Sequence, residues 1–339
     1  MPSINTVNNP TCRQLPEVPA GDGLPPSGRT GISATEDTRS ASREGRQSPW
    51  PAAALLAAAF LWGGSFTAMR VAVAEMGPAG VVWCRMIIAL VIVIPFAKKL
   101  IPRRYRRGDW KLLLPMVLFQ PCFYFLLEAN ALRFTTSSQA GVISAAVPLM
   151  VALGAWITLH EPLRPRTLFG LAVSVLGVVT LTLLESPGGR ATNPLLGNLL
   201  EVLAMVSAAA NILLVKRLSQ RYSPWTLTAM QVCAGAIFFL PGGLSLMNGG
   251  WPAWNPSLVA ILLFLGAFVT LGAFGLYNWG MSRVTATSAS VYINLVPVTA
   301  VMTGWGLLGE TLGPWQILSA VAVVGGVWLS QQKAADTHR

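Results

Sequence analysis

Three ionisable residues lie inside long apolar stretches of this sequence: Arg85, Glu128 and Glu201. An ionised side chain inside a bilayer is costly, and such residues usually pair with one another or line a path for ions or solutes. At 1.5 Å per helical residue, Arg85 lies about 10 Å and Glu128 about 6 Å from the ends of their stretches. Both depths refer to the same predicted side of the membrane, and Glu201 has a similar depth.

Two roles for these residues stay open. Arg85 and a carboxylate can form a pair, which neutralises both charges and locks two helices together. Alternatively, Arg85 binds the carboxylate of a substrate, or Glu128 takes up a proton. The similar depths favour the pair over proton uptake by Glu128.

Aromatic, polar and proline residues lie near the middle of other apolar stretches. A proline inside a helix removes one hydrogen bond and kinks the chain. The freed carbonyl can bind a substrate ammonium group where it faces a cavity, or the kink only shapes the packing. An aromatic ring there can stack on a substrate or fill space. These residues are Trp62, Ser65, Pro148, Tyr292, Asn294 and Pro297.

The side chains on which most enzymes depend are missing from the apolar stretches. His160 and His338 lie outside them, and so does every aspartate. The sequence has no HExxH metal motif, no GxSxG elbow and no phosphate-binding loop, and its four cysteines show no CxxC spacing. We therefore predict that the protein is not an enzyme, that it holds no metal or cofactor, and that it does not hydrolyse ATP.

The stretches that position these residues dominate the composition. Of 339 residues, 53% are hydrophobic and only 11% are charged, compared with about 25% charged residues in soluble domains. A helix of about 20 residues crosses a hydrocarbon core of about 30 Å. We predict an all-α polytopic membrane protein with ten transmembrane helices, at 52–70, 78–97, 112–132, 136–158, 166–184, 197–215, 224–246, 256–281, 286–308 and 312–331.

The basic residues predict the orientation of these helices. If both termini are cytoplasmic, 20 of the 24 Lys and Arg residues fall on the cytoplasmic side and three on the other, as the positive-inside rule requires. They occur in short clusters between apolar stretches, unlike the basic surface of a nucleic-acid-binding protein. The net charge of +11 therefore indicates topology in a cell (inner) membrane, with no nucleic-acid partner.

The second half of the sequence repeats the first. Pro148 lies 149 residues before Pro297, and Glu161 lies the same distance before Glu310. Because each half contains five predicted helices, an odd number, the halves are inverted relative to each other, an arrangement found in secondary transporters. We interpret both glutamates as caps that complement the positive end of the helix that follows each of them.

Residues earlier in the halves align at an offset of 146. Arg85 then corresponds to Gln231, and Ser65 to Asn211. The second half therefore carries an amide where the first carries a charge. The residues predicted to line a substrate cavity are Trp62, Ser65, Arg85, Glu128, Pro148, Asn211, Gln231, Tyr277, Tyr292, Asn294 and Pro297.

The chain divides into four predicted parts. Residues 1–49 are polar and cannot bury enough apolar surface to fold. We expect a disordered, dispensable cytoplasmic tail there, or translation that starts further along. The first repeat covers 50–185, the second covers 195–332, and 333–339 form a short cytoplasmic tail.

Two small-residue patterns lie on the fifth helix of each half. They are Gly170-xxx-Ser174 and Ala322-xxx-Gly326, and such patterns let helices approach closely. We expect them to pack within one chain, which favours a monomer, with a dimer as the alternative.

The repeated segments resemble a known family. AFLWGGSF at 59–66, VPLMVALGAWITLHE at 147–161 and VPVTAVMTGWGLLGE at 296–310 resemble the EamA-type transporters of the drug/metabolite transporter superfamily. The resemblance covers 50–331 and implies two inverted five-helix repeats around a central cavity. In that family the first four helices of each half line the cavity, and many members export amino acids or other small metabolites.

These observations lead to one favoured function and two alternatives. We expect a secondary active transporter that exports a small metabolite, such as an amino acid, by alternating access across the lipid bilayer, with proton coupling left open. An exporter of drug-like or cationic amphipathic compounds is the first alternative. A channel is less favoured, because an inverted repeat argues against a simple symmetric pore.

Overall fold

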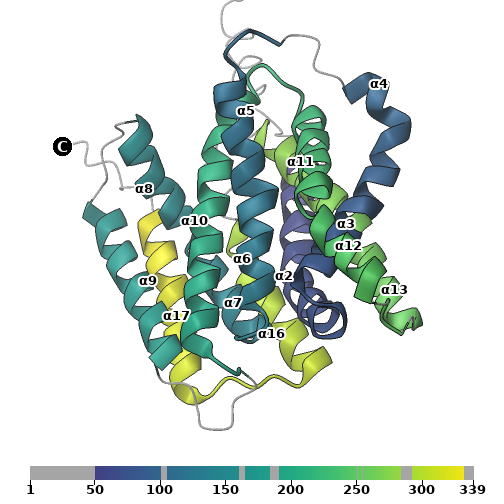
Figure 1. Cartoon of the computed structure of the whole chain (residues 1–339). Helices are drawn as coiled ribbons and strands as arrows, with labels where there is room; N and C mark the ends of the chain where they lie inside the picture. Colours follow the sequence, from purple (N-terminus) through teal and green to yellow (C-terminus); the bar gives the residue numbers. More distant parts are fainter. Residues whose placement is uncertain are drawn as a thin grey trace, which may run out of the picture. The chain divides into compact units, whose positions relative to one another are not determined.

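A computed structural model describes residues 50–100, 105–159, 165–183, 191–249, 251–253, 255–283 and 292–331. These ranges contain helices and no strand (Figure 1). Both predicted tails, Glu161 and the first residues of the predicted helix 286–308 lie outside the described residues.

The first half contains long helices interrupted at defined points. Its third helix consists of α5, a π-helical segment η2 and α6, and its fourth consists of α7 and α8. The bounds are α2 Trp50–Met76, α3 Pro78–Val93, η1 Ile94–Phe96, α4 Ala97–Leu100, α5 Trp110–Val117, η2 Leu118–Phe123, α6 Tyr124–Ala131, α7 Ser137–Ser144, α8 Val147–Leu159 and α9 Pro165–Leu183.

The second half has interruptions at matching places. A π-helical segment, η3, divides its third helix, as η2 does in the first half. The bounds are α10 Pro194–Leu218, α11 Pro224–Phe238, α12 Leu240–Gly249, α13 Pro256–Leu263, η3 Phe264–Ala273, α14 Phe274–Met281, α16 Leu295–Leu308 and α17 Pro314–Gln331.

Local sequence explains where several of these helices begin. α3, α10, α11 and α13 each start with proline, whose missing N–H is not needed in the first turn. The side chains of Asn193 and Asn255 accept hydrogen bonds from the amides of Leu196 and Leu258, so both cap the helix that follows.

Six helices of the described part are long and apolar enough to cross a membrane, or seven if the bent pair α11 and α12, which meet at 43°, forms one span. These match six of the ten predicted spans, or seven with the bent pair. The other three predictions correspond to shorter apolar helices at Leu168–Leu183, Leu295–Leu308 and Pro314–Gly326. Large apolar side chains such as Phe60 and Ile237 are exposed on the outside of the bundle, where lipid would cover them. The chain is therefore a multi-pass membrane protein.

Pro148 and Pro297 do not kink continuous helices as predicted. Pro148 is the second residue of α8, and Pro297 is the third residue of α16. A proline fits in the first turn of a helix, because the amide that it lacks would have no helical partner there. The break at Ala145 and Ala146, between α7 and α8, therefore comes before the proline.

The helices pack in pairs that link the two halves. α2 packs on α14 and α16, while α10 packs on α6 and α8. α9 and α17 lie side by side (Figure 1). A Cβ added to Gly326 would lie 2.6 Å from the carbonyl oxygen of Gly170 and 2.9 Å from the amide nitrogen of Ser174. The two small-residue patterns therefore pack against each other within the chain.

Candidate functional site

A cavity lies between the two halves of the bundle, with about 660 Å³ of space between atoms, part of which is open to the surroundings. Residues of α2, η2, α6, α7, α8, α10, α14 and α16 line it. Its polar lining includes Ser65, Gln120, Tyr124, Asn211, Tyr277 and Asn278. None of the described residues that line it is an acid or a base other than tyrosine, so the cavity presents hydroxyls, amides and aromatic faces.

One wall of the cavity is aromatic. The indole ring of Trp62 lies 4.8 Å from the ring of Tyr277 and 5.3 Å from the ring of Phe274, centroid to centroid. The indole N–H is buried and has no hydrogen-bond partner among the described residues. An unpaired buried donor is unusual, because buried donors are normally paired.

Three amide side chains form a connected group beside the cavity. Asn211 donates to the Gln120 side chain (2.8 Å), and Gln231 donates to the Asn211 side chain (3.0 Å). Gln120 has extended backbone angles, φ −145° and ψ 121°, inside η2. At this break the Phe119 carbonyl still accepts from the Tyr124 amide, and side chains from the second half add further hydrogen bonds. The Gln120 carbonyl accepts from Gln231 (3.1 Å), and the Phe119 carbonyl accepts from the hydroxyl of Ser207 (2.8 Å).

Arg85 is buried beside the other π-helical segment. Its Nε donates to the hydroxyl of Thr270 in η3 (3.0 Å), and its guanidinium lies 4.2 Å from the ring centroid of Phe125. Arg85 and its sequence counterpart Gln231 therefore each contact the divided third helix of the opposite half.

The predicted ion pair between Arg85 and a carboxylate is not formed among the described residues. The guanidinium group of Arg85 contacts Thr270 and Phe125 instead. Arg85 still interacts with Glu128 electrostatically. Glu128 accepts a hydrogen bond from the hydroxyl of Tyr124 (2.6 Å). The prediction therefore had the neighbourhood right and the direct contact wrong.

Glu201 is the third of these charged residues, and it is fully buried, at 0% exposed. Neither of its carboxylate oxygens has a hydrogen-bond partner among the described residues. Its electrostatic neighbour is Glu128, which is 3% exposed.

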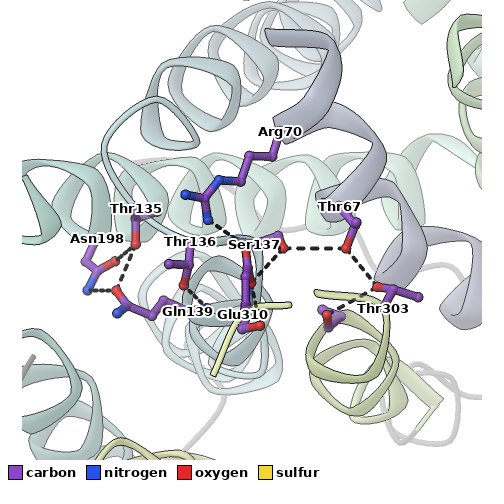
Figure 2. Close-up of polar contacts among 11 residues, drawn as sticks. Thr67, Arg70, Thr135, Thr136, Ser137, Gln139, Asn198, Thr303 and Glu310 are labelled. Atoms are coloured by element: carbon purple, nitrogen blue, oxygen red, sulfur yellow. Dashed lines mark hydrogen bonds and ion pairs between the residues drawn. The ribbon is translucent and has the colours of Figure 1, made fainter. Parts of the chain in front are cut away.

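A second polar group is the Glu310 cluster, much of which Figure 2 shows. It consists of Thr67, Arg70, Ser137, Ser138, Thr303 and Glu310. Glu310 accepts from the backbone amides of Ser137 (3.1 Å) and Ser138 (2.9 Å) and from both hydroxyls, and it forms an ion pair with Arg70. Thr67 links the hydroxyls of Ser137 (3.4 Å) and Thr303 (2.8 Å).

The prediction that Glu310 caps the helix that follows it is wrong about the helix. That helix, α17, begins four residues later, at Pro314. Glu310 instead binds the first two amides of α7, in the opposite half, where a carboxylate complements the positive end of the helix. Burial alone would raise the pKa of Glu310, but the Ser138 hydroxyl and amide, Arg70 and Ser137 together lower it below its ordinary value.

The polar contacts continue from the Glu310 cluster to α10. The hydroxyl of Thr135 lies 2.6 Å from the side-chain oxygen of Asn198 and 2.8 Å from that of Gln139 (Figure 2). Asn198 also donates to Thr182 in α9 (2.9 Å). This end of the bundle is therefore held by contacts among α2, α7, α9, α10 and α16.

A different contact, the Asp109 cluster, lies at the other end of the span Trp110–Ala131. Asp109 forms an ion pair with Arg221 and accepts from the hydroxyl of Tyr222 (2.7 Å) and the amide of Arg106 (3.1 Å). The bond from Tyr222 contributes most to a lowered pKa of Asp109. Burial, followed by the bond to Asp109, raises the pKa of Tyr222 to about 12. The sequence analysis gave Asp109 no role.

The predicted site residues fall into two groups around the cavity. Trp62, Ser65, Asn211 and Tyr277 line it directly. The others adjoin its lining: Glu128 and Gln231 through hydrogen bonds to Tyr124 and Asn211, Arg85 beside Phe125, and Pro148, Tyr292, Asn294 and Pro297 as chain neighbours of lining residues. Sequence reasoning missed Gln120 and Tyr124, although Gln120 precedes a proline inside an apolar stretch, which is a signal for a helix break.

Comparison with known sequences links the chain to transporters. The sequence model of the EamA-like transporter family matches residues 49–183 and again residues 195–331. A transporter of Archaeoglobus fulgidus is 25% identical over 275 residues, covering 80% of this chain and 94% of the relative.

Two further relatives carry names that specify a substrate. A probable terminal-alkyne amino-acid exporter of Streptantibioticus cattleyicolor is 25% identical over 84% of this chain and 95% of its own length. An S-adenosylmethionine/S-adenosylhomocysteine transporter of Chlamydia trachomatis is 28% identical over 79% of this chain and 85% of its own length.

The fold also resembles a solved structure. A crystal structure superimposes with a TM-score of 0.54 at 18% identity, covering 82% of this chain and 95% of the other. At this identity the likeness concerns the fold alone.

Proposed function

The chain belongs to the EamA-like transporter family, and on this basis we propose that it is a secondary active transporter that exports a small metabolite by alternating access. The observation that carries the proposal is the cavity between the two halves, with polar and aromatic lining from both. The proposed location is the cell (inner) membrane, with both termini in the cytoplasm.

We further propose that ten helices form two inverted five-helix repeats. Reciprocal contacts support this: Arg85 of the first half bonds to η3, and its counterpart Gln231 of the second half bonds to η2. A pseudo-two-fold axis produces such exchanged contacts. The π-helical segments η2 and η3 and the breaks before Pro148 and Pro297 also recur at matching places.

Alternating access requires that each end of the cavity can close. In the proposed orientation the Glu310 cluster faces outward and the Asp109 cluster faces the cytoplasm. The Glu310 cluster joins α2 and α7 of the first half to the segment after α16 in the second half. Several charged hydrogen bonds make this connection. Such a contact supports its assignment as the outer closure, which must break before a solute leaves the cavity.

The cavity lining favours a substrate whose charges balance. Its described residues offer hydroxyl and amide groups, aromatic rings and a large apolar area, but no ionised side chain to neutralise a net charge. A zwitterion with an apolar or aromatic part, such as an amino acid, suits this lining. The relative named as a probable terminal-alkyne amino-acid exporter supports this class. An exporter of cationic amphipathic compounds is the alternative, with Glu128 behind Tyr124 as the counter-charge.

Transport in proteoliposomes tests the proposal. The purified protein would be reconstituted with a panel of labelled amino acids and S-adenosylmethionine, alongside a labelled cationic dye. Saturable uptake of an amino acid that accelerates when the same unlabelled compound is inside indicates a carrier. Flux that never saturates indicates a channel, and transport of the dye alone favours the alternative. Trp62→Ala should weaken transport, while Phe60→Ala, an exposed neighbour on the same helix, should not.

A further inference from the structure

Glu201 is a buried carboxylate without a hydrogen-bond donor. It is fully buried in α10, and both of its oxygens are unpaired among the described residues. An ionised carboxylate without a partner in a low-dielectric interior is strongly disfavoured, and the group is instead neutralised. The ligand that neutralises Glu201 must therefore be found among its neighbours or come from solution.

Among the described residues, the neighbours of Glu201 do not supply the missing charge. The helices and segments packed on α10 are α5, η2, α6, α7, α8 and α9. From α6, Tyr124 and Glu128 interact with Glu201 electrostatically, and Arg85 of α3 interacts with Glu128. The remaining titratable residues on the packed elements are Cys122 in η2, Lys111 at the start of α5 and Arg166 at the start of α9; α7 and α8 carry none.

The net charge of this group is therefore −1 if both carboxylates are ionised. Arg85 supplies one positive charge, whereas Glu128 and Glu201 would supply two negative charges if both were ionised. Lys216 and Arg217, on α10 itself, lie about 22 Å further along the helix. One bound proton restores neutrality, and it requires no ligand other than a carboxylate oxygen.

Both carboxylates lie one helical turn from the cavity. On α6, Glu128 follows the cavity-lining residue Tyr124 by four positions and accepts a hydrogen bond from its hydroxyl group. On α10, Glu201 precedes the cavity-lining residue Met205 by four positions. Residues four apart lie on the same face of a helix. The directions of α6 and α10 place both carboxylates on the side of the cavity that leads to the Glu310 cluster.

We propose that Glu201 binds a proton, and that this proton exchanges with Glu128, which contacts the cavity through Tyr124. Binding adds H⁺ to a carboxylate oxygen, and dissociation releases it unchanged, so no other reactant is needed. Proton binding follows from the cluster alone. The further step, that a substrate in the cavity shifts the proton and so couples transport to a pH gradient, rests on the proposed function.

Infrared spectroscopy of the purified protein in lipid nanodiscs tests proton binding without any substrate. At pH 7 exposed carboxyl groups are ionised, so a carboxylic-acid C=O band that shifts in D₂O reports a protected, protonated carboxyl. We expect this band in the wild type, its loss in Glu201→Gln, and its retention in Glu75→Gln, an exposed control on α2. In Glu128→Gln the band should vanish at a lower pH than in the wild type, because a nearby negative charge has been removed.

Three outcomes would overturn the proton site. They are a wild type without the band, a band that survives in Glu201→Gln, and a band that appears only when sodium is removed, which would identify Na⁺ as the native ligand. Gln is uncharged and similar in shape, so Glu201→Gln should fold, as a single gel-filtration peak would verify. If Glu201→Gln does not fold, Glu128→Gln decides the question: a band that is retained there, and that vanishes at a lower pH, belongs to a carboxyl other than Glu128 that feels its charge, whereas loss of the band would overturn the assignment to Glu201.

Proteoliposome transport then tests coupling separately. For an amino acid that the wild type carries, Glu201→Gln should reduce flux driven by a pH gradient at least tenfold while leaving equal exchange of the same amino acid within twofold. Unchanged gradient-driven flux would overturn coupling but not proton binding. If the wild type carries no compound of the panel, the proposed function fails while the infrared result for Glu201 stands.

Discussion

At the scale of single residues, Glu310 both caps the start of one helix and forms an ion pair with another. It accepts from two amides at the start of α7 and pairs with Arg70 of α2. Each of these contacts is stronger when Glu310 is ionised, and together they lower its pKa. The stability that Glu310 contributes therefore depends on pH.

Glu310→Gln should lower the free energy of unfolding by about 2 kcal/mol near pH 7, because charged hydrogen bonds are lost. The folded-state pKa lies below the ordinary value of 4.5, so the contribution is complete above that value and disappears as the pH falls through the folded-state pKa. Thermal melting in detergent across a pH series should show the difference from wild type shrinking below about pH 4.5. A difference that is the same at every pH would contradict this account, and Glu75→Gln serves as the control.

Arg85 and Glu128 should behave as coupled neighbours rather than as a direct pair. Arg85→Ala and Glu128→Ala should each destabilise the protein, since each leaves the other buried charge less compensated. The double variant should be less destabilised than the sum, with a coupling energy of about 1 kcal/mol, less than a direct buried pair gives. Denaturation of the wild type, the two single variants and the double variant measures this coupling energy. Strictly additive losses would contradict the electrostatic interaction.

At the scale of helices, hydropathy predicted the spans well but not their interruptions. The predicted helix 112–132 matches the span Trp110–Ala131. A helix satisfies all the backbone hydrogen bonds of about twenty apolar residues within a bilayer. The extended backbone at Gln120 could not be predicted from apolar periodicity. Ser207 and Gln231, from distant parts of the chain, donate to the Phe119 and Gln120 carbonyls at this break.

The predicted cavity residues show the same division. Trp62 and Asn211 line the cavity; Trp62 was predicted from its aromatic ring near the middle of an apolar stretch, and Asn211 from its correspondence to Ser65 in the repeat. The contact of Glu310 with α7 could not be predicted, because local sequence offered a nearer helix end and only tertiary packing brings Ser137 and Ser138 into reach.

The contact between α9 and α17 gives a prediction with a matched control. A methyl group on Gly326 would lie 2.6 Å from the Gly170 carbonyl, whereas one on the adjacent Gly325 meets nothing within 4 Å. Gly326→Ala should therefore destabilise the protein by about 1–3 kcal/mol through overpacking, and Gly325→Ala should leave stability unchanged or slightly raised. Thermal melting compares the two, and equal effects would contradict the close approach.

At the scale of the whole molecule, the distribution of basic residues predicts the orientation in the membrane. A cysteine at Asn248, exposed at the end of α12, should react with an impermeant maleimide in intact cells. A cysteine at Gln220, exposed between α10 and α11, should react only after lysis. Both substitutions would be made in a variant whose four native cysteines are replaced by serine. The reverse pattern would invert the proposed topology and exchange the sides of the Glu310 and Asp109 clusters.

The neutral lining of the cavity has an electrical consequence. Since the described lining residues carry no ionised acid or base, a loaded cavity moves only the charge of its contents through the membrane field. That field acts on one elementary charge with about 2.3 kcal/mol per 100 mV. A zwitterion alone would be carried without current and without regard to voltage, whereas one accompanying proton would make every cycle move a single charge. The sign and size of the transient current on a solid-supported membrane would therefore count the protons carried with each solute molecule.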